Sequence, residues 1–490
     1  MGFVPVMTTT ATTTITGLVT AVTNLLSVRS SSKFSAGMRD CSKQTRFLWN
    51  CVAALTAFFI AGAHAQAGGA CQPRSDGSNP CPVALHRPHS RPLSAMAQIG
   101  RAMFYDTALS GSGRLSCASC HDPANHYGPS GVAAVFLGGT DMKSQGRRAV
   151  PSLMYLERQP AFSIGPDDPL AETAPQIQAA SATTSHGPKS AANTAASAAN
   201  LVPQGGLFWD GRADTFQQQA TGPLYDPVEM ASTREKVLNR LNHAPYTAAL
   251  KQMAGVSGEK SPDFLLDEAM FALSRYQVEE KDFHPYSSKF DSWLEGRAKF
   301  TALERRGYLL FNDPEKGNCA ACHVDTPQAN GLPPLFTDHQ YEALGAPRNS
   351  DILKNRDASY YDLGVCDARS AGRNELAAYC GMFATPTLRN SATRKAFFHN
   401  GVFHSLDKVL EFYALRDIDP KRFYSRDSSG NVRAYDDLPP QYQANLDTTD
   451  APLDRKLGDQ PRISEDERSE IIAFLKTLTD REATMGHAAP

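Results

Sequence analysis

Two short segments of this chain each place two cysteines and a histidine at a spacing that suits one chemistry. They are Cys117, Cys120 and His121, and Cys319, Cys322 and His323. Two thiols three residues apart can reach the two vinyl groups of one porphyrin, and the adjacent histidine can bind its iron. A redox Cys-x-x-Cys or half of a zinc site would explain one match better than two. The pattern therefore predicts two covalently bound haem c groups, with His121 and His323 as the proximal iron ligands.

The segment before the first motif predicts export, which c-type haem attachment also requires. A basic stretch at residues 39–46 precedes an apolar run at residues 47–61, which ends in Ala63-His64-Ala65. This order is typical of a secretory signal peptide. We expect residues 1–65 to be removed and the mature protein to be periplasmic, without stable membrane insertion. Residues before Met38 are rich in Thr and Ser, so Met38 is an alternative start. A membrane anchor is the weaker interpretation, because the run is short.

The remaining cysteines and the charge balance limit the class of protein further. Outside the signal peptide and the haem motifs, Cys71, Cys81, Cys366 and Cys380 remain. An even number in an oxidising compartment predicts disulfides, and Cys71–Cys81 with Cys366–Cys380 is the simplest pairing. The 49 Lys and Arg residues nearly balance the 51 Asp and Glu residues. No basic face for nucleic acid is implied.

Helices are the elements that must position these motifs. Apolar residues at helical spacing begin at Leu93, before the first motif, and a second pattern at residues 301–311 leads into the second motif. A last helix opens at Ser464, with Glu467 completing a capping box. No strand alternation is evident, and residues 167–206 have the composition of a loop. Further helices are expected at residues 215–220, 234–242, 246–253, 263–278 and 406–413.

The predicted fold class is all-α, with two cytochrome c-like haem-binding lobes and long loops. We expect an extended N-terminal arm over residues 66–92. The two haem c domains are expected over residues 93–297 and 298–482, each wrapped round one haem.

Further segments carry a resemblance to a known family. They include Gly100-Arg101-Ala102-Met103-Phe104, Phe208-Trp209-Asp210-Gly211-Arg212, Pro227-Val228-Glu229-Met230, Pro386-Thr387-Leu388-Arg389-Asn390 and Phe398-His399-Asn400-Gly401. In this order, over roughly residues 93–478, the chain closely resembles the bacterial dihaem cytochrome c peroxidase and MauG superfamily.

The resemblance implies unequal roles for the two haems. The first, held by His121, would be the peroxide site, with Gln219, Pro223 and Glu229 lining its distal pocket. Glu229 would move a proton between the two peroxide oxygens, and burial would raise its pKa toward the working range. The second haem would transfer electrons, with Trp209 as a relay between the two.

Three departures from the family pattern sharpen these expectations. Activated peroxidases of the family carry a histidine that caps the resting iron, but here only His126 lies in that stretch, so we expect an open first iron. Tyr413 falls where MauG-like proteins place a tyrosine ligand to the second iron, with Met382 as the backup. Members of the family usually bind calcium between the lobes. In this chain Ala149 stands at the position of a ligand, and it has no side-chain oxygen for calcium.

Three functions remain open at this point. The first is a peroxidase that reduces hydrogen peroxide with electrons from a donor cytochrome c or a cupredoxin. The second is a MauG-like oxidase that uses high-valent haem to modify residues of a partner protein, which Tyr413 and the missing histidine favour. The third is a dihaem electron carrier without catalysis, which Gln219 and Glu229 argue against, because a carrier needs both irons fully ligated.

Overall fold

The structure is a computed structural model that describes residues 71–89, 91–166, 201–255, 262–369 and 376–481. The predicted signal peptide and the alternative start at Met38 lie outside these residues, as does most of the predicted loop at 167–206. The helices are α3 (Ala95–Phe104), α4 (Phe216–Tyr225), α5 (Arg234–His243), α6 (Thr247–Met253), α7 (Pro262–Glu279), α8 (Lys289–Leu294), α9 (Ala302–Asn312), α10 (Val365–Arg369), α11 (Leu406–Leu415) and α12 (Glu465–Lys476).

The predicted helices are confirmed, because their signals are local. Ser464 caps α12 and forms the predicted capping box with Glu467, while Thr301 and Glu304 do the same for α9. Helix α8 was not predicted. A helix this short contains too few apolar repeats for its sequence pattern to be distinguished from that of a loop.

The expectation of no strands is wrong in detail. In the described part of the chain, three two-stranded antiparallel sheets occur. Such short strands carry no readable alternation, so only their tertiary partners reveal them. The fold is mostly helical with small sheets. The strands are β1 (Leu137–Gly138) with β2 (Ser144–Gln145), β3 (Ser163–Pro166) with β4 (Leu201–Gln204), and β5 (Tyr341–Glu342) with β6 (Phe383–Ala384).

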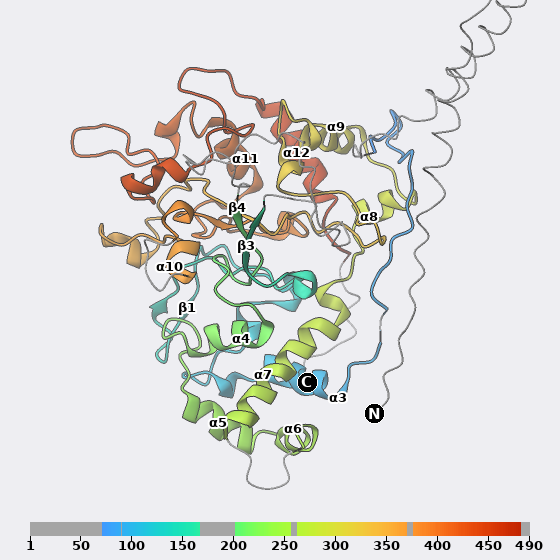
Figure 1. The fold of residues 1–490 in the computed structure, drawn as a ribbon, viewed down its shortest axis with the longest axis vertical. Helices are drawn as coiled ribbons and strands as arrows, with labels where there is room; N and C mark the ends of the chain where they lie inside the picture. The colour runs from blue at the N-terminus through green and yellow to red at the C-terminus, as the bar shows by residue number, and fades with distance from the viewer. Residues whose placement is uncertain (1–70, 90, 167–200, 256–261, 370–375, 482–490) are drawn as a thin grey trace, which may run out of the picture. The chain divides into compact units, whose positions relative to one another are not determined.

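Two sets of helices pack around separate apolar clusters (Figure 1). We call α3 to α7 the first helical region, and α8, α9, α11 and α12 the second helical region. Helix α10 packs into a third apolar cluster. Aromatic rings dominate both clusters. In the first, the Tyr127 and Phe283 rings stack with centroids 3.7 Å apart; in the second, the Trp293 and Phe300 rings stack at 4.5 Å. Such burial of large rings is the main source of each cluster's stability.

The two helical regions share one packing arrangement. Helix α3 lies against α7 in the first, and α9 lies against α12 in the second. Each contact is made at a glycine: a Cβ at Gly100 would collide with the Ala272 carbonyl, and a Cβ at Gly307 would collide with the Glu470 carbonyl. Only glycine lets the helix backbones approach this closely. The structure therefore contains an internal repeat, which the sequence analysis missed.

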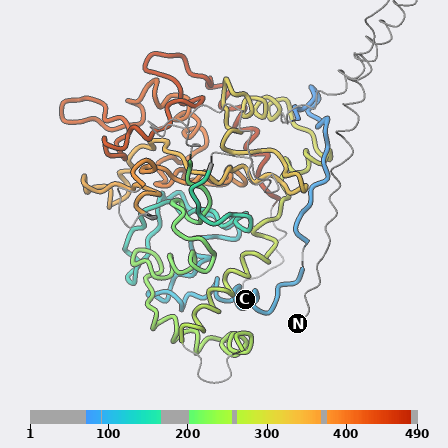
Figure 2. Tube along the Cα trace, viewed as in Figure 1, coloured from blue at the N-terminus to red at the C-terminus, as the bar shows by residue number. Residues whose placement is uncertain are grey.

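The N-terminal arm packs against the second region before entering α3 of the first (Figure 2). The predicted Cys71–Cys81 disulfide is confirmed. The Gly77 carbonyl accepts hydrogen bonds from Trp293 Nε1 at 3.0 Å and from the Phe300 backbone N–H at 2.9 Å. These two hydrogen bonds attach the N-terminal arm to the second helical region. Among the described helices, none has the length and apolar character that crossing a bilayer requires.

Candidate haem sites

The two Cys-x-x-Cys-His segments adopt the same local structure. Each forms a short 3-10 helix, at Cys117–Ser119 and Cys319–Ala321. The histidine backbone N–H then donates to the carbonyl of the first cysteine, at 3.0 Å for His121 and 2.8 Å for His323. None of these four cysteines forms a disulfide. This tight turn brings two thiols and an imidazole together, as thioether attachment of a porphyrin requires.

The two histidines present the ring atom that an iron needs. His121 Nδ1 lies 3.2 Å from the Tyr127 carbonyl, and His323 Nδ1 lies 2.9 Å from the Phe336 carbonyl. A carbonyl can only accept, so Nδ1 carries the proton and Nε2 keeps its lone pair for a metal. Burial lowers the pKa of His121 to about 4 and lowers that of His323 as well, so both rings are neutral.

A large, mostly apolar cavity reaches the second motif. Thiols, an imidazole and aliphatic walls in one enclosed space suit a porphyrin with an iron at its centre. The cavity also extends to residues of the first region, including Trp209 and Gln219. Its lining around the second motif includes Cys319, Cys322, His323, Phe311, Leu410, Tyr413, Ile471 and Leu475.

Tyr413 projects into this cavity from α11. Its phenol interacts electrostatically with Cys319 and Cys322, and burial raises its pKa. The Tyr413 hydroxyl has no hydrogen-bond partner among the described residues. An enclosed, unpartnered oxygen beside a haem motif suits a metal ligand. Met382, the backup ligand, instead packs into a separate apolar cluster, is 5% exposed, and does not line the cavity.

Glu229 lies beside the first motif, as Tyr413 lies beside the second. Its carboxylate interacts electrostatically with Cys120. The Glu229 side chain keeps accessible surface, while nearby protein atoms partly desolvate it. This desolvation raises its pKa, the Asp226 charge adds to this, and Arg212 opposes it. A carboxyl with a raised pKa can both accept and return a proton.

The predicted distal residues lie on α4 and on the turn after it. Gln219 and Pro223 lie one helical turn apart, so both side chains lie on the same face of α4. The Met230 backbone N–H donates to the Pro223 carbonyl at 3.0 Å, which brings the neighbouring Glu229 back toward the helix. Gln219 is buried and lines the large cavity, whereas Pro223 and Glu229 do not.

Trp209 is fixed by hydrogen bonds on two sides. Its indole Nε1 donates to the Ala149 carbonyl at 2.8 Å, and its own carbonyl accepts from the Ala384 N–H at 2.9 Å. The Ala149 N–H in turn donates to the His399 carbonyl at 2.7 Å. The Trp209 ring therefore lies where segments of both regions meet, at the wall of the cavity.

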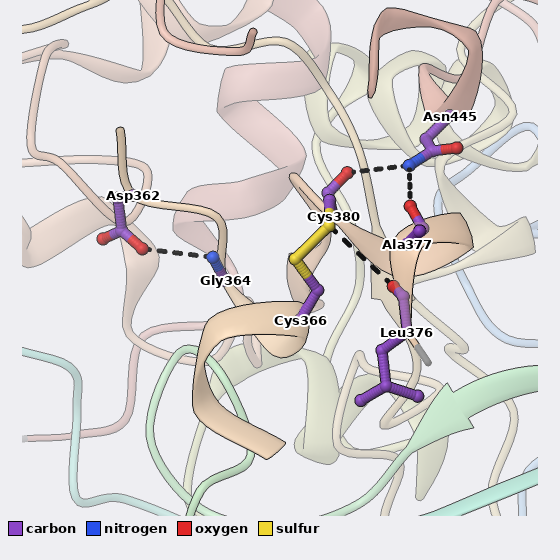
Figure 3. Close-up of a disulfide and its surroundings, with 7 residues drawn as sticks. All are labelled: Asp362, Gly364, Cys366, Leu376, Ala377, Cys380 and Asn445. Carbon is purple, nitrogen blue, oxygen red and sulfur yellow. Dashed lines mark hydrogen bonds between the residues drawn. A yellow bond between two sulfur atoms is a disulfide. The ribbon is translucent and has the colours of Figure 1, made fainter. Parts of the chain in front are cut away.

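The predicted Cys366–Cys380 disulfide is confirmed (Figure 3), and the residue after it, Gly381, lines the cavity. Asn445 Nδ2 donates to the Ala377 carbonyl at 2.8 Å and to the Cys380 carbonyl at 3.1 Å. The disulfide thereby holds the chain that runs into β6, whose Ala384 contacts Trp209.

At the calcium position implied by the resemblance, two neighbouring backbone carbonyls already accept hydrogen bonds. The Ala149 side chain offers no oxygen, and its carbonyl already accepts the Trp209 indole. The next carbonyl, of Val150, accepts from the guanidinium of Arg394 at 2.8 Å. A fixed cation at this point disfavours a second one. No step below depends on calcium.

The internal repeat also relates α4 to α11, which the sequence analysis missed. Thr215 caps α4 and Ser405 caps α11, each accepting a backbone N–H three residues on. Pro223 and Tyr413 occupy the same position in these helices, counting from cap to residue (215 to 223 and 405 to 413). The recurring Phe-x-Asp/Asn-Gly at residues 208–211 and 398–401 could have revealed the repeat.

Comparisons with known proteins identify the family of this chain. Residues 94–299 match the family described as di-haem cytochrome c peroxidase. The methylamine utilization protein MauG of Paracoccus denitrificans is 32% identical over 413 residues, which cover 82% of this chain and 92% of that protein. The cytochrome c551 peroxidase of Nitrosomonas europaea is 29% identical over 343 residues, 69% of this chain and 78% of the relative.

A solved structure supports the same relationship. The diheme peroxidase BthA from Burkholderia thailandensis aligns with a TM-score of 0.68 at 32% identity, covering 80% of this chain and 88% of that chain. The chain belongs to the di-haem cytochrome c peroxidase family that includes MauG, a family of oxidoreductases, and so takes two haem cofactors.

Proposed function

We propose that this protein is a periplasmic dihaem c-type peroxidase that reduces hydrogen peroxide with electrons from a donor cytochrome or a small redox protein. The observation that carries the proposal is the unequal surroundings of two equal motifs. A carboxylate, Glu229, lies beside Cys120, while a phenol, Tyr413, lies beside Cys319 and Cys322. A carrier would have no use for a carboxylate beside one of its haem motifs.

The chain's own residues have distinct tasks in this proposal. Cys117, Cys120, Cys319 and Cys322 hold the two haems by thioether bonds, within domains 93–297 and 298–482. The bound haems supply the electrons that cleave the peroxide O–O bond. The net reaction consumes one peroxide, two electrons and two protons and releases two waters.

Proton movement at the first site falls to Glu229. Its carboxylate accepts the proton from one peroxide oxygen and returns it to the leaving oxygen. Gln219 offers an amide N–H to orient the peroxide, and Pro223 supplies no atom that could bind iron. Tyr413 would hold the second iron through its phenol oxygen, which would leave no place there for peroxide. Trp209 lies on the electron path between the two sites.

A MauG-like oxidase is the second candidate function. The observation that favours it is Tyr413, because a hard phenolate oxygen stabilises oxidised iron and lowers the reduction potential. Such an enzyme would use the oxidising equivalents of peroxide on residues of a partner protein instead of drawing electrons from a donor.

The test is peroxide added to the purified protein with and without reduced cytochrome c, followed in the visible and near infrared. Steady, catalytic oxidation of the cytochrome supports the peroxidase. A long-lived oxidised species with little cytochrome turnover supports the oxidase. No consumption of peroxide under either condition would leave only the electron carrier.

A further inference from the structure

Arg394 is an enclosed cation without a counter-ion. It directly follows the short 3-10 helix Ser391–Thr393 and lines the large cavity, which its remaining accessible surface faces. Its guanidinium makes one hydrogen bond, from Nη2 to the Val150 carbonyl at 2.8 Å. Among the described residues, no carboxylate pairs with it, and Nε and Nη1 have no acceptor.

Three other enclosed arginines of the described residues are neutralised by carboxylates. Arg389 binds Asp291 at 2.7 Å and Arg416 binds Asp417 at 2.7 Å. Arg148 binds Asp362 at 2.6 Å and also contacts Asp210. At Arg394 burial acts unopposed and lowers the pKa to about 10. An unpaired charge that is largely withdrawn from water is unfavourable, so this position favours an anion that the described part of the chain does not supply.

The surroundings identify the chemical class of that anion. Arg394 shares the cavity wall with His323 and Tyr413, and its charge also acts on His121. Both haem positions are therefore within its electrostatic reach. Each haem carries two propionate carboxylates, and the planar fork of a guanidinium matches a carboxylate with two parallel hydrogen bonds.

The internal repeat shows that this charge is specific to one half of the molecule. Arg394 is the first residue after the 3-10 helix Ser391–Thr393. Gln159 is the first residue after the equivalent 3-10 helix, Leu156–Arg158. Gln159 is neutral and is satisfied, with Nε2 donating to the Gly206 carbonyl at 2.8 Å and Oε1 facing His339 Nδ1 at 2.7 Å. A glutamine can occupy this position in the fold.

We propose that Arg394 binds a propionate carboxylate of one of the two haems and raises the reduction potential of that haem. This inference rests on the dihaem cofactor content of the proposed function, but not on peroxide turnover. Removal of the positive charge lowers the potential of the haem it serves. It also frees the enclosed propionate to take up a proton near neutral pH, which makes that potential depend on pH.

The test is spectroelectrochemical titration of both haems in the haem-loaded full-length protein, between pH 5.5 and 8. Arg394→Gln, which places the residue of the other half here, is compared with Arg394→Lys and with Lys395→Gln, an exposed neighbour. We expect Arg394→Gln to lower one potential and make it pH dependent. Arg394→Lys retains most of the wild-type value, and Lys395→Gln changes nothing. The haem that shifts, identified by its spin state, is the one whose propionate is bound.

Two outcomes would overturn the inference. The first is two unchanged, pH-independent potentials in Arg394→Gln with both haems present by the pyridine haemochrome assay. If that variant does not load haem, a crystal structure of the wild-type holoprotein decides. A propionate oxygen within hydrogen-bond distance of the guanidinium supports the proposal, and any other anion there, or none, contradicts it. Normal peroxide turnover alongside either negative result would leave the proposed function intact.

Discussion

The first and second haem motifs show how one local structure can serve two chemistries. Both form a 3-10 turn that carries two thiols, and both give the histidine Nδ1 a backbone carbonyl. The difference lies on the helix that the repeat places nearby. Helix α4 carries Pro223 where α11 carries Tyr413.

The consequence of this difference is chemical. A proline ring has no donor atom for iron, whereas a phenol does, so in the proposed function this one difference would leave the first site open and close the second. Glu229, on the turn after α4, would then serve the open site. In this account, the repeat supplies the haem-binding frame, and the residues on α4 and α11 decide the function of each half.

The largest expected effect is on the open site. We expect Glu229→Gln to reduce peroxide turnover by about 10²–10⁴-fold, because an amide cannot accept and return the proton. Steady-state oxidation of reduced cytochrome c by peroxide measures it. Glu235→Gln, on an exposed face of α5, is the matched control and should retain activity. Wild-type rates in Glu229→Gln would remove this residue from the mechanism.

A change at the closed site should alter its spin state and leave the other site alone. Tyr413→Phe removes the only side-chain oxygen that the described α11 places on the cavity wall, so the second iron should become high-spin and its potential should rise. Visible spectra and redox titration follow both changes. Tyr360→Phe, a half-buried tyrosine outside the cavity, serves as the control. An unaltered low-spin signal in Tyr413→Phe would point to another ligand.

The Cys366–Cys380 disulfide offers a smaller perturbation of the same wall. It spans 14 residues, so replacing both cysteines by serine should cost about 3 kcal/mol of unfolding free energy. Because the bridge holds the approach to β6 and Trp209, the spectrum of the second haem should also change. The Cys71Ser/Cys81Ser double variant should lose a similar stability without the spectral change. Chemical denaturation and absorbance distinguish the two, and matching spectra would contradict the positioning role.

The smallest expected effect is on the acid limb of the pH profile of kcat/KM. Burial raises the pKa of Glu229 above its usual 4.5. The carboxylate is the form that accepts the proton, so kcat/KM falls as pH drops through this pKa, by up to about tenfold per pH unit. The limb should therefore lie at higher pH than for an ordinary glutamate, and it should be absent in Glu229→Gln. An inflection at or below 4.5 would mean that the carboxyl is solvated.

Local patterns in the sequence predicted much of the fold. The haem motifs, the helix caps at Thr301 and Ser464, and both disulfide pairs depend on residues close in the chain or few in number. The short strands and the glycine contacts at Gly100 and Gly307 depend on partners far along the chain, so no window of sequence contains them.

The sequence predicted which residues belong to the candidate site, but not how they are arranged in space. The resemblance supplied Glu229, Gln219, Trp209 and Tyr413 as candidates, and their roles remain proposals. The equivalence of Pro223 and Tyr413 emerges only when α4 and α11 are compared as structures. Arg394 carried no signal at all, because an arginine in sequence looks solvated until its missing counter-ion is seen.

The measurement that tests the central claim most directly is the EPR spectrum of the oxidised protein as isolated. An open first iron and a second iron closed by Tyr413 should give one high-spin and one low-spin ferric signal, without prior reduction. Two low-spin signals and no high-spin signal would contradict the account, because the first iron would then carry a sixth ligand that Pro223 cannot provide.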